Sequence, residues 1–283
     1  MITTIANKNI EAAINHKGAE LISLKTKSGT EYIWEGNPAF WGKHSPVLFP
    51  IVGTLKNNNY IYNGHAYSLS RHGFARDMEF RLSEKTNDSA VFSLLYNEET
   101  LKVYPFKFEL QLIYTLEENS LNIAYKVINM ENSELLFSIG AHPAFALGGT
   151  FEEYSIEMEK PEKLEYHLLD NDLLSDKTKT IAPKDNSFDL NYPLFENDAL
   201  IFKRLESESL TILNKQQPFL RISFKGFPFL GIWTKQNAPF ICIEPWYGHS
   251  DTTGSNGNLT DKQGIQKLDV NSIFNATFSI TIL

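Results

Sequence analysis

Apolar and polar positions alternate with a period of two along much of the chain. Within residues 108–116, every second position carries a large apolar side chain. The alternation resumes over residues 121–127, after a short polar segment at 117–119. Because successive side chains of a strand point to opposite faces, this pattern predicts two half-buried strands joined by a tight turn.

A second hairpin is predicted at residues 60–67. Its Asn63-Gly64 pair suits a type I′ turn, in which both central residues need a positive φ. Short helices are expected only near residues 97–100 and near Ser155, and residues 185–193 are expected to form a loop. The further strand-like runs are residues 19–26, 90–96, 135–140, 199–203, 210–214, 219–224, 229–234, 240–244 and 277–283.

Many short strands without alternating βαβ units predict an all-β protein. The expected architecture is an antiparallel β-sandwich or barrel with few short helices. The 283 residues suffice for a large core, and no linker, repeat or low-complexity segment indicates a second domain. We therefore expect a single domain that spans residues 1–283.

Composition and charge exclude several classes of partner. The apolar content of 42% and the charged content of 21% are typical of soluble globular proteins. The formal net charge of −8 argues against nucleic acid, and no run of Lys and Arg suits an anionic membrane surface. Residues 1–7 lack the pattern of a signal peptide, and no apolar run reaches transmembrane length. The expected location is the cytoplasm.

Three short stretches carry the candidate chemistry: residues 71–76 (RHGFAR), 140–145 (GAHPAF) and 243–246 (IEPW). Each places an ionisable side chain beside Gly or Pro at the edge of an apolar segment. Such edges are where a folded scaffold presents side chains to a pocket. Two imidazoles and a carboxylate are what acid–base chemistry near neutral pH requires.

Glu244 is the strongest single candidate. On a strand over residues 240–244, Phe240, Cys242 and Glu244 point to one face, so the carboxylate ends an apolar strand. Partial desolvation there would raise its pKa and make it a better base near pH 7. The alternative is an exposed glutamate at a strand end. Pro245 and Trp246 favour the first interpretation, because they predict a rigid turn and an aromatic platform beside the carboxylate.

The other candidates each have a purely structural alternative. His142 follows a predicted strand that Pro143 ends, and it could instead be a buried histidine that the backbone satisfies. Arg71 and Arg76 flank His72 and offer forked donors to hydroxyl, carboxylate or phosphate oxygens, or they are surface arginines with acidic neighbours. Asp198 precedes a predicted strand and could simply cap a turn.

Other chemistries are disfavoured. Cys242 is the only cysteine, so no intramolecular disulfide forms, and its apolar context predicts a small buried hydrophobe rather than a nucleophile. The spacings of metal sites, such as His-x-His or paired cysteines, are absent, as are the Gly-x-Ser-x-Gly elbow and a Gly-rich phosphate loop. No metal and no cofactor are therefore expected.

In combination and in this order, residues 71–76, 141–143 and 244–245 resemble the aldose 1-epimerase (galactose mutarotase) family, in particular its LacX-like branch. The resemblance continues through residues 18–24 and 46–53 and runs nearly end to end. It implies a large galactose mutarotase-like β-sandwich, with the sugar site in a cleft over one sheet. It also implies the interconversion of the α and β anomers of an aldose, a hexose being the expected substrate.

The resemblance further implies roles for single residues. Glu244 matches the general base, His142 the general acid and His72 the histidine that binds the ring region of the sugar. Asp198 matches an aspartate that holds sugar hydroxyls. Trp246 is a substrate-binding candidate because aromatic rings stack on apolar sugar faces, although most aromatic residues of the chain are expected to be sandwich core.

One departure from the family pattern concerns the arginine-rich stretch that typically follows the glycine at Gly53. Residues 54–57 (TLKN) stand there instead, so the arginine role would pass to Arg71 or Lys56. Hexose 6-phosphates therefore stay open as substrates, as does a sugar-binding protein without turnover. Glycoside hydrolysis is disfavoured, because it needs two facing carboxylates and only Glu244 has a strong context.

Overall fold

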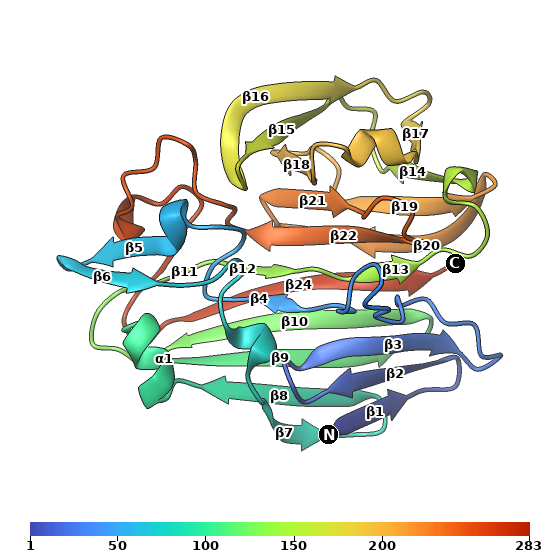
Figure 1. The fold of residues 1–283 in the computed structure, drawn as a ribbon. Helices are drawn as coiled ribbons and strands as arrows, with labels where there is room; N and C mark the ends of the chain where they lie inside the picture. Colours follow the sequence, from blue (N-terminus) through green and yellow to red (C-terminus); the bar gives the residue numbers. More distant parts are fainter.

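The computed structural model describes residues 1–283 and consists mainly of antiparallel strands in two large sheets (Figure 1). From edge to edge, the nine-stranded sheet contains β17 (Ser187–Asp189), β14 (Tyr154–Met158), β19 (Ser209–Asn214), β20 (Gln217–Ser223), β24 (Ile273–Ile282), β10 (Ser120–Asn129), β9 (Phe108–Glu117), β8 (Ser89–Leu95) and β7 (Arg81–Lys85). The eight-stranded sheet contains β16 (Leu173–Ile181), β15 (Leu164–Asp170), β18 (Leu200–Lys203), β21 (Phe229–Trp233), β22 (Phe240–Tyr247), β12 (Ile139–Ala141) and β4 (Val47–Leu48), and β13 (Ala144–Ala146) also pairs with β22.

Smaller elements complete the fold. The three-stranded sheet contains β1 (Ile2–Ala6), β2 (Ile10–Asn15) and β3 (Glu20–Thr26), and the two-stranded sheets pair β5 (Asn59–Tyr62) with β6 (His65–Ser68) and β11 (Leu135–Phe137) with β23 (Gln266–Leu268). The helical segments are α1 (Glu98–Val103) and the 3₁₀ turns Lys56–Asn58, Ala75–Asp77, Phe151–Glu153, Tyr192–Phe195 and Leu259–Asp261. None of them combines the length and the apolar character that a membrane-spanning helix requires.

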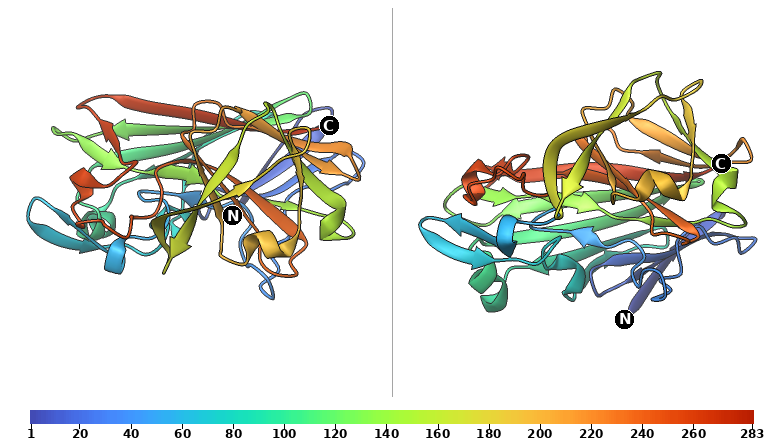
Figure 2. Two further views of the ribbon diagram at one scale, coloured as in Figure 1. Left: turned by 90° about the horizontal axis from the view of Figure 1, so that it is seen from above. Right: turned by 45° about the horizontal axis from the view of Figure 1, so that its top comes forward.

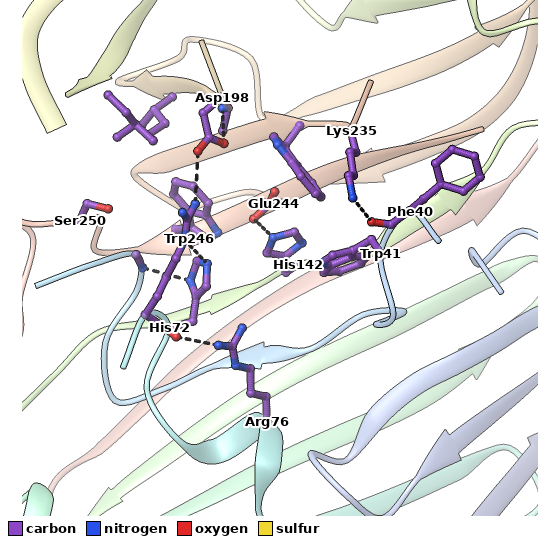
Figure 3. A pocket seen from close by; sticks show the side chains of 16 residues that line it. Phe40, Trp41, His72, Arg76, His142, Asp198, Lys235, Glu244, Trp246 and Ser250 are labelled. Atoms are coloured by element: carbon purple, nitrogen blue, oxygen red, sulfur yellow. Dashed lines mark hydrogen bonds and ion pairs between the residues drawn. The ribbon is translucent and has the colours of Figure 1, made fainter. Parts of the chain in front are cut away.

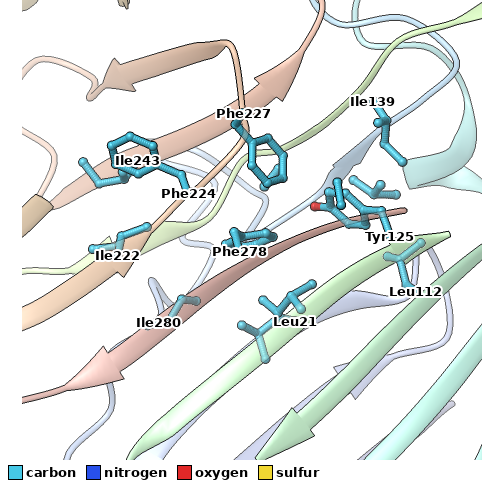
Figure 4. Close-up of a cluster of buried hydrophobic side chains, with 14 of the residues drawn as sticks. Leu21, Leu112, Tyr125, Ile139, Ile222, Phe224, Phe227, Ile243, Phe278 and Ile280 are labelled. Carbon is cyan, nitrogen blue, oxygen red and sulfur yellow. The ribbon is translucent and has the colours of Figure 1, made fainter. Parts of the chain in front are cut away.

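The sheets pack face to face around one continuous core of 65 buried residues (Figures 1 and 2). Ile222 and Ile280 of the nine-stranded sheet, Ile243 of the eight-stranded sheet and Leu21 of the three-stranded sheet all belong to it (Figure 4). Burial of apolar surface contributes about 25 cal/mol per Å², so this shared core holds the layers together. The prediction of an antiparallel all-β sandwich is confirmed.

The two predicted hairpins and the first predicted helix are confirmed. β9 and β10 pair without interruption, and the buried residues of both strands alternate with half-buried ones. The β5–β6 turn has positive φ at both Asn63 (49°) and Gly64 (77°), as a type I′ turn requires. Helix α1 begins with a capping box, in which Asn97 and Thr100 satisfy each other's backbone N–H groups.

Four local predictions are wrong. Ser155 lies in the strand β14, where Tyr154, Ile156 and Met158 are buried with a period of two. The predicted strand 135–140 is split at Ser138 into β11, which pairs with β23, and β12, which pairs with β22 and β4. The predicted loop 185–193 contains β17, and the turn expected at Pro245 is instead the continuation of β22 to Tyr247.

Candidate active site

The central feature of the site is a cross-strand pair on the eight-stranded sheet. β22 pairs with β12 through Ile139 and Gly140, and with β13 through residues 144–146. His142 and Pro143 interrupt this ladder, yet the register is the same on both sides of the interruption. His142 therefore lies directly opposite Glu244, and its Nε2 is 3.3 Å from the Oε2 of Glu244 (Figure 3).

Trp246 forms a flat wall beside this pair. Its indole lies against Gly231 of β21 and Gly140 of β12, where an added Cβ would approach ring atoms to 2.6 and 2.4 Å. The indole N–H donates to the carbonyl of Ala141 at 3.1 Å. Gly231 pairs with Glu244 and has no side chain, and the indole of Trp246 occupies the space that a side chain there would take.

Glu244 and His142 are both deeply buried, with 2% and 8% exposure. Burial raises the pKa of Glu244 well above its ordinary value, against a smaller opposing effect of Arg71. Burial also lowers the pKa of His142 to about 3. The ring of His142 stacks on Trp41 at 4.8 Å, and its buried Nδ1 has no hydrogen-bond partner. The uncharged forms are thus favoured, with one proton in the contact between Nε2 and Oε2.

His72 stands next to this pair, with its ring centre 5.7 Å from that of His142. Burial, the neighbouring His142 and two arginines hold the pKa of His72 well below its ordinary value, so the ring is neutral. The backbone N–H of Gly53 donates to Nδ1 at 3.1 Å, and the Nε–H of Arg71 donates to Nε2 at 3.2 Å. A neutral imidazole accepts only one hydrogen bond. The fixed Gly53 N–H occupies Nδ1, so Nε2 can carry the proton and donate to a ligand only when the Arg71 side chain moves away from it.

Arg71 connects the histidines to two aspartates. Its guanidinium lies 3.0 Å from Asp172 and 3.7 Å from Asp198. Asp198 has a left-handed φ of 75°, and its Oδ1 accepts the N–H of Ala199, so the predicted local cap is present. The other oxygen of Asp198 faces Arg71. The side chains of Arg71 and Asp198 thus line the same cavity as His72.

Arg76 and Lys56 differ in their positions. Arg76 lines the cavity and donates to the carbonyl of Arg71 at 2.8 Å, while its buried Nε has no hydrogen-bond partner. Lys56 does not line the cavity, because its Nζ donates to the carbonyls of Thr253 and Ser255. Of the candidates for the family arginine role, Arg71 and Arg76 therefore line the cavity and Lys56 does not.

The cavity that these residues form has a volume of about 430 Å³. All six residues singled out as catalytic or substrate-binding candidates in the sequence line it, so segments around residues 72, 142, 198 and 244 converge on one place. The full lining is Phe40, Trp41, Gly53, Arg71, His72, Arg76, His142, Leu169, Asp198, Ala199, Ile201, Trp233, Lys235, Glu244, Trp246 and Ser250.

Sequence reasoning did not single out Trp233, Lys235 and Ser250, whereas Trp41 is one of the aromatic residues near the candidate stretches that could stack on a sugar face. Trp233 could have been found, since it lies two residues after Gly231 on the same face of a predicted strand. Trp41 and Lys235 come from loops, where Lys235 donates to the carbonyl of Phe40 at 2.8 Å. No local pattern marks these loop positions, because the tertiary fold alone brings them to the site.

The sequence model of the family described as aldose 1-epimerase matches residues 1–264. The chain belongs to the aldose 1-epimerase family. This confirms the resemblance that residues 71–76, 141–143 and 244–245 carry.

Relatives and solved structures agree with this assignment. The plasmid and chromosomal LacX proteins of Lactococcus lactis subsp. lactis are each 36% identical to the chain and match over 99% of both lengths. A galactose mutarotase related enzyme from Lactobacillus acidophilus has 37% identity and a TM-score of 0.95, over 100% of this chain and 97% of its own. A galactose mutarotase-like protein from Lactobacillus casei has 29% identity and a TM-score of 0.94, over 100% of both chains.

Proposed function

We propose that this protein is an aldose 1-epimerase, which interconverts the α and β anomers of a hexose by general acid–base catalysis. The observation that carries the proposal is the buried contact of 3.3 Å between His142 and Glu244 on the wall of a cavity. In the reaction, a base removes the proton of the anomeric hydroxyl and an acid protonates the ring oxygen. The C1–O5 bond breaks, the aldehyde turns about C1–C2, and the ring closes on the other face.

The pair supplies both groups at once. The pair has two protonation states with the same number of protons. In one, a carboxylic acid at Glu244 faces a neutral His142, and in the other, a carboxylate faces an imidazolium. Moving one proton across the contact therefore creates the base and the acid together. Ring closure moves the protons back, so the same residues exchange roles. General acid and general base catalysis contribute about 10²–10⁴-fold each, which suffices for a reaction that sugars undergo slowly unaided.

The remaining residues would hold the sugar. His72 Nε2–H and the guanidinium of Arg71 offer donors, and Asp198 accepts hydrogen bonds from hydroxyls. The Trp246 and Trp41 rings provide flat apolar walls, which is the usual composition of a ligand cavity with a few polar groups. The reaction requires no cofactor.

Phosphorylated hexoses are the second candidate substrates. Three cationic side chains, Arg71, Arg76 and Lys235, line the cavity against the carboxyl groups of Asp198 and Glu244. Arg71, however, is already paired with Asp172 and Asp198, and the Nε of Arg76 is 3.8 Å from Asp77. Because these acids offset the positive charge, we propose a neutral aldose as the substrate.

Polarimetry tests the proposal directly. Freshly dissolved α-D-glucose and α-D-galactose should reach anomeric equilibrium faster with the native protein than with the same protein after heat denaturation. A sugar-binding protein without turnover would instead bind the sugars in calorimetry and leave the decay of optical rotation unchanged. That result would reject the proposed enzymatic activity.

A further inference from the structure

Three side chains with different metal-binding atoms meet at one side of the cavity. The ligand atoms of His142, Cys242 and Glu244 all lie within 4.8 Å of one another, and all three residues are buried. Cys242 and Glu244 are two residues apart on β22 and share a face, while His142 comes from the neighbouring strand pair. The sequence spacing conceals this cluster, because His142 is far from β22 along the chain.

The distances suit zinc. Zn²⁺ binds histidine nitrogen at about 2.0–2.1 Å, carboxylate oxygen at about 2.0–2.2 Å and sulfur at about 2.3 Å in a tetrahedron, so its ligand atoms stand about 3.3–3.7 Å apart. The Nε2 of His142 and the Oε2 of Glu244 are already 3.3 Å apart. The thiol of Cys242, within 4.8 Å of both, needs a shift on the order of 1 Å to complete three vertices.

We propose that His142, Cys242 and Glu244 form a binding site for a zinc-like divalent transition-metal ion, and that the ion inhibits the enzyme. The fourth vertex faces the cavity, which His142 and Glu244 line and through which the ion enters. The thiol proton leaves to solvent as the metal–sulfur bond forms. Mg²⁺ and Ca²⁺ are excluded by chemistry, because they require six or more ligands, mainly oxygens.

The surroundings indicate a reversible site rather than a structural one. A metal-binding histidine usually donates its second N–H to a carboxylate or carbonyl, and loss of that contact costs about 10–100-fold in affinity. The Nδ1 of His142 has no such partner, since Trp41 covers the ring. Cys242 packs among the apolar side chains of Trp34, Ala144 and Phe240, outside the cavity lining. Inhibition rests on the proposed function, whereas metal binding does not.

The test measures binding and inhibition separately on the full chain. Zn²⁺ is titrated by calorimetry, and Co²⁺ is used as a spectroscopic substitute because a thiolate ligand gives it a charge-transfer band. We expect one ion per chain, the cobalt–thiolate band, and loss of mutarotation when Zn²⁺ is present. Cys242→Ser should keep mutarotation in metal-free buffer, lose the band and bind Zn²⁺ at least 10-fold more weakly. His65→Ala, on the exposed hairpin β5–β6, is the matched control and should behave like the native chain.

Each outcome decides one statement. If the native chain binds no Zn²⁺, or if Cys242→Ser keeps the affinity and the cobalt band, the metal site is rejected. If Cys242→Ala and Cys242→Ser both unfold, the band in the native protein decides, since Cys242 is the only thiol. If zinc binds through Cys242 and an active enzyme is unaffected, the inhibition is rejected. If zinc binds through Cys242 but no sugar is turned over at all, the metal site stands and the proposed function fails.

Discussion

His142 and His72 are both buried and neutral, yet their nitrogens face different groups. The Nε2 of His142 contacts Glu244, while its Nδ1 has no partner. The Nδ1 of His72 accepts the backbone N–H of Gly53, and its Nε2 faces the side chain of Arg71, which also lines the cavity. His142 is thus placed to exchange a proton, whereas His72 is placed to hold an oxygen in one position. The two residues should respond differently to substitution.

Glu244→Gln should lower the mutarotation rate by about 10²–10⁴-fold, the usual size of a general-base effect. The amide keeps the shape of the carboxyl group but cannot take up the proton. Sugar affinity in calorimetry should change little. The control is Glu84→Gln on the exposed strand β7, which should leave the rate unchanged. A Glu244→Gln variant with native activity in stopped-flow polarimetry would remove Glu244 from the mechanism.

His142→Asn should depress kcat much more than it raises KM, because the proposed proton transfer acts only in the transition state. His72→Asn should raise KM as well, since it removes a donor that the bound sugar uses. The two variants are compared by initial rates over a range of sugar concentrations. If both change KM alone, His142 is a binding residue and the acid lies elsewhere.

The elements around the site depend on strand β22 and its neighbours. The sequence pattern predicted β22 from residue 240 to 244, but the strand continues through Pro245 to Tyr247. Pro245 pairs with Leu230 on one side, and on the other side the ladder is interrupted at His142 and Pro143. The missing N–H of the proline therefore costs little there. The result is an extended strand that places Cys242, Glu244 and Trp246 in one row.

Gly231→Ala should destabilise the protein by about 1–3 kcal/mol, the usual cost of overpacking. An added Cβ would stand 2.6 Å from the indole of Trp246, which must then move away from the sheet. The melting temperature, tryptophan fluorescence and KM for sugar should all change. Gly254→Ala is the matched control, because its Cβ would meet nothing within 4 Å and its φ is not in the left-handed region. Equal behaviour of both variants would show that the wall tolerates movement.

The net charge of the whole protein and the charges at the cavity wall differ in their effect on a bound substrate. The formal net charge is −8, whereas three cationic side chains line the cavity. Of these, Arg71 is paired with Asp172. Charges more than about 8–10 Å apart are largely screened at physiological salt. The groups at the cavity wall therefore matter more than the net charge.

A neutral hexose should have the higher kcat/KM in a comparison of glucose with glucose 6-phosphate. The reason is that Asp172 and Asp198 already neutralise Arg71. The comparison is made at low and at high salt, because a phosphate held by arginine would lose affinity as salt rises. A large, salt-sensitive preference for the phosphate would overturn the neutral substrate and point to Arg76 and Lys235 as its ligands.

Acid should destabilise the fold between about pH 6.5 and pH 3. Burial lowers the pKa of His249 and of His142 to about 3, so below pH 6.5 these histidines bind protons in the unfolded chain and not in the folded one, while the raised pKa of Glu244 offsets part of the effect of His142. Each such histidine lowers the free energy of unfolding by about 2 kcal/mol when the pH falls from 7 to 5. His249→Gln should remove the contribution of this histidine. The free energy of unfolding of the variant should therefore fall less between pH 7 and pH 5 than that of the native chain, as urea titrations at both pH values would measure. A fall as large as that of the native chain would contradict the buried neutral state of His249.

Most of the local structure and the candidate residues could be predicted from the order of amino acids alone. The period of two specifies strands, because it reflects the pleat of the backbone, and Asn63-Gly64 specifies its turn, because it reflects allowed φ angles. Ser155 shows where local prediction fails. It was expected near a helix, but it lies in β14, which pairs with β17 on one side and with β19 on the other. The motif order around His72, His142 and Glu244 also sufficed to indicate the family.

How these residues meet depends on the tertiary fold. The position of His142 opposite Glu244 depends on the register between segments about a hundred residues apart, and no local pattern encodes such a register. The same register brings the thiol of Cys242 to the pair, which spacing motifs could not reveal. Trp41 and Lys235 reach the cavity from loops whose paths depend on the packed sheets beneath them. Long-range pairing and packing, rather than local propensity, therefore create the chemistry of this site.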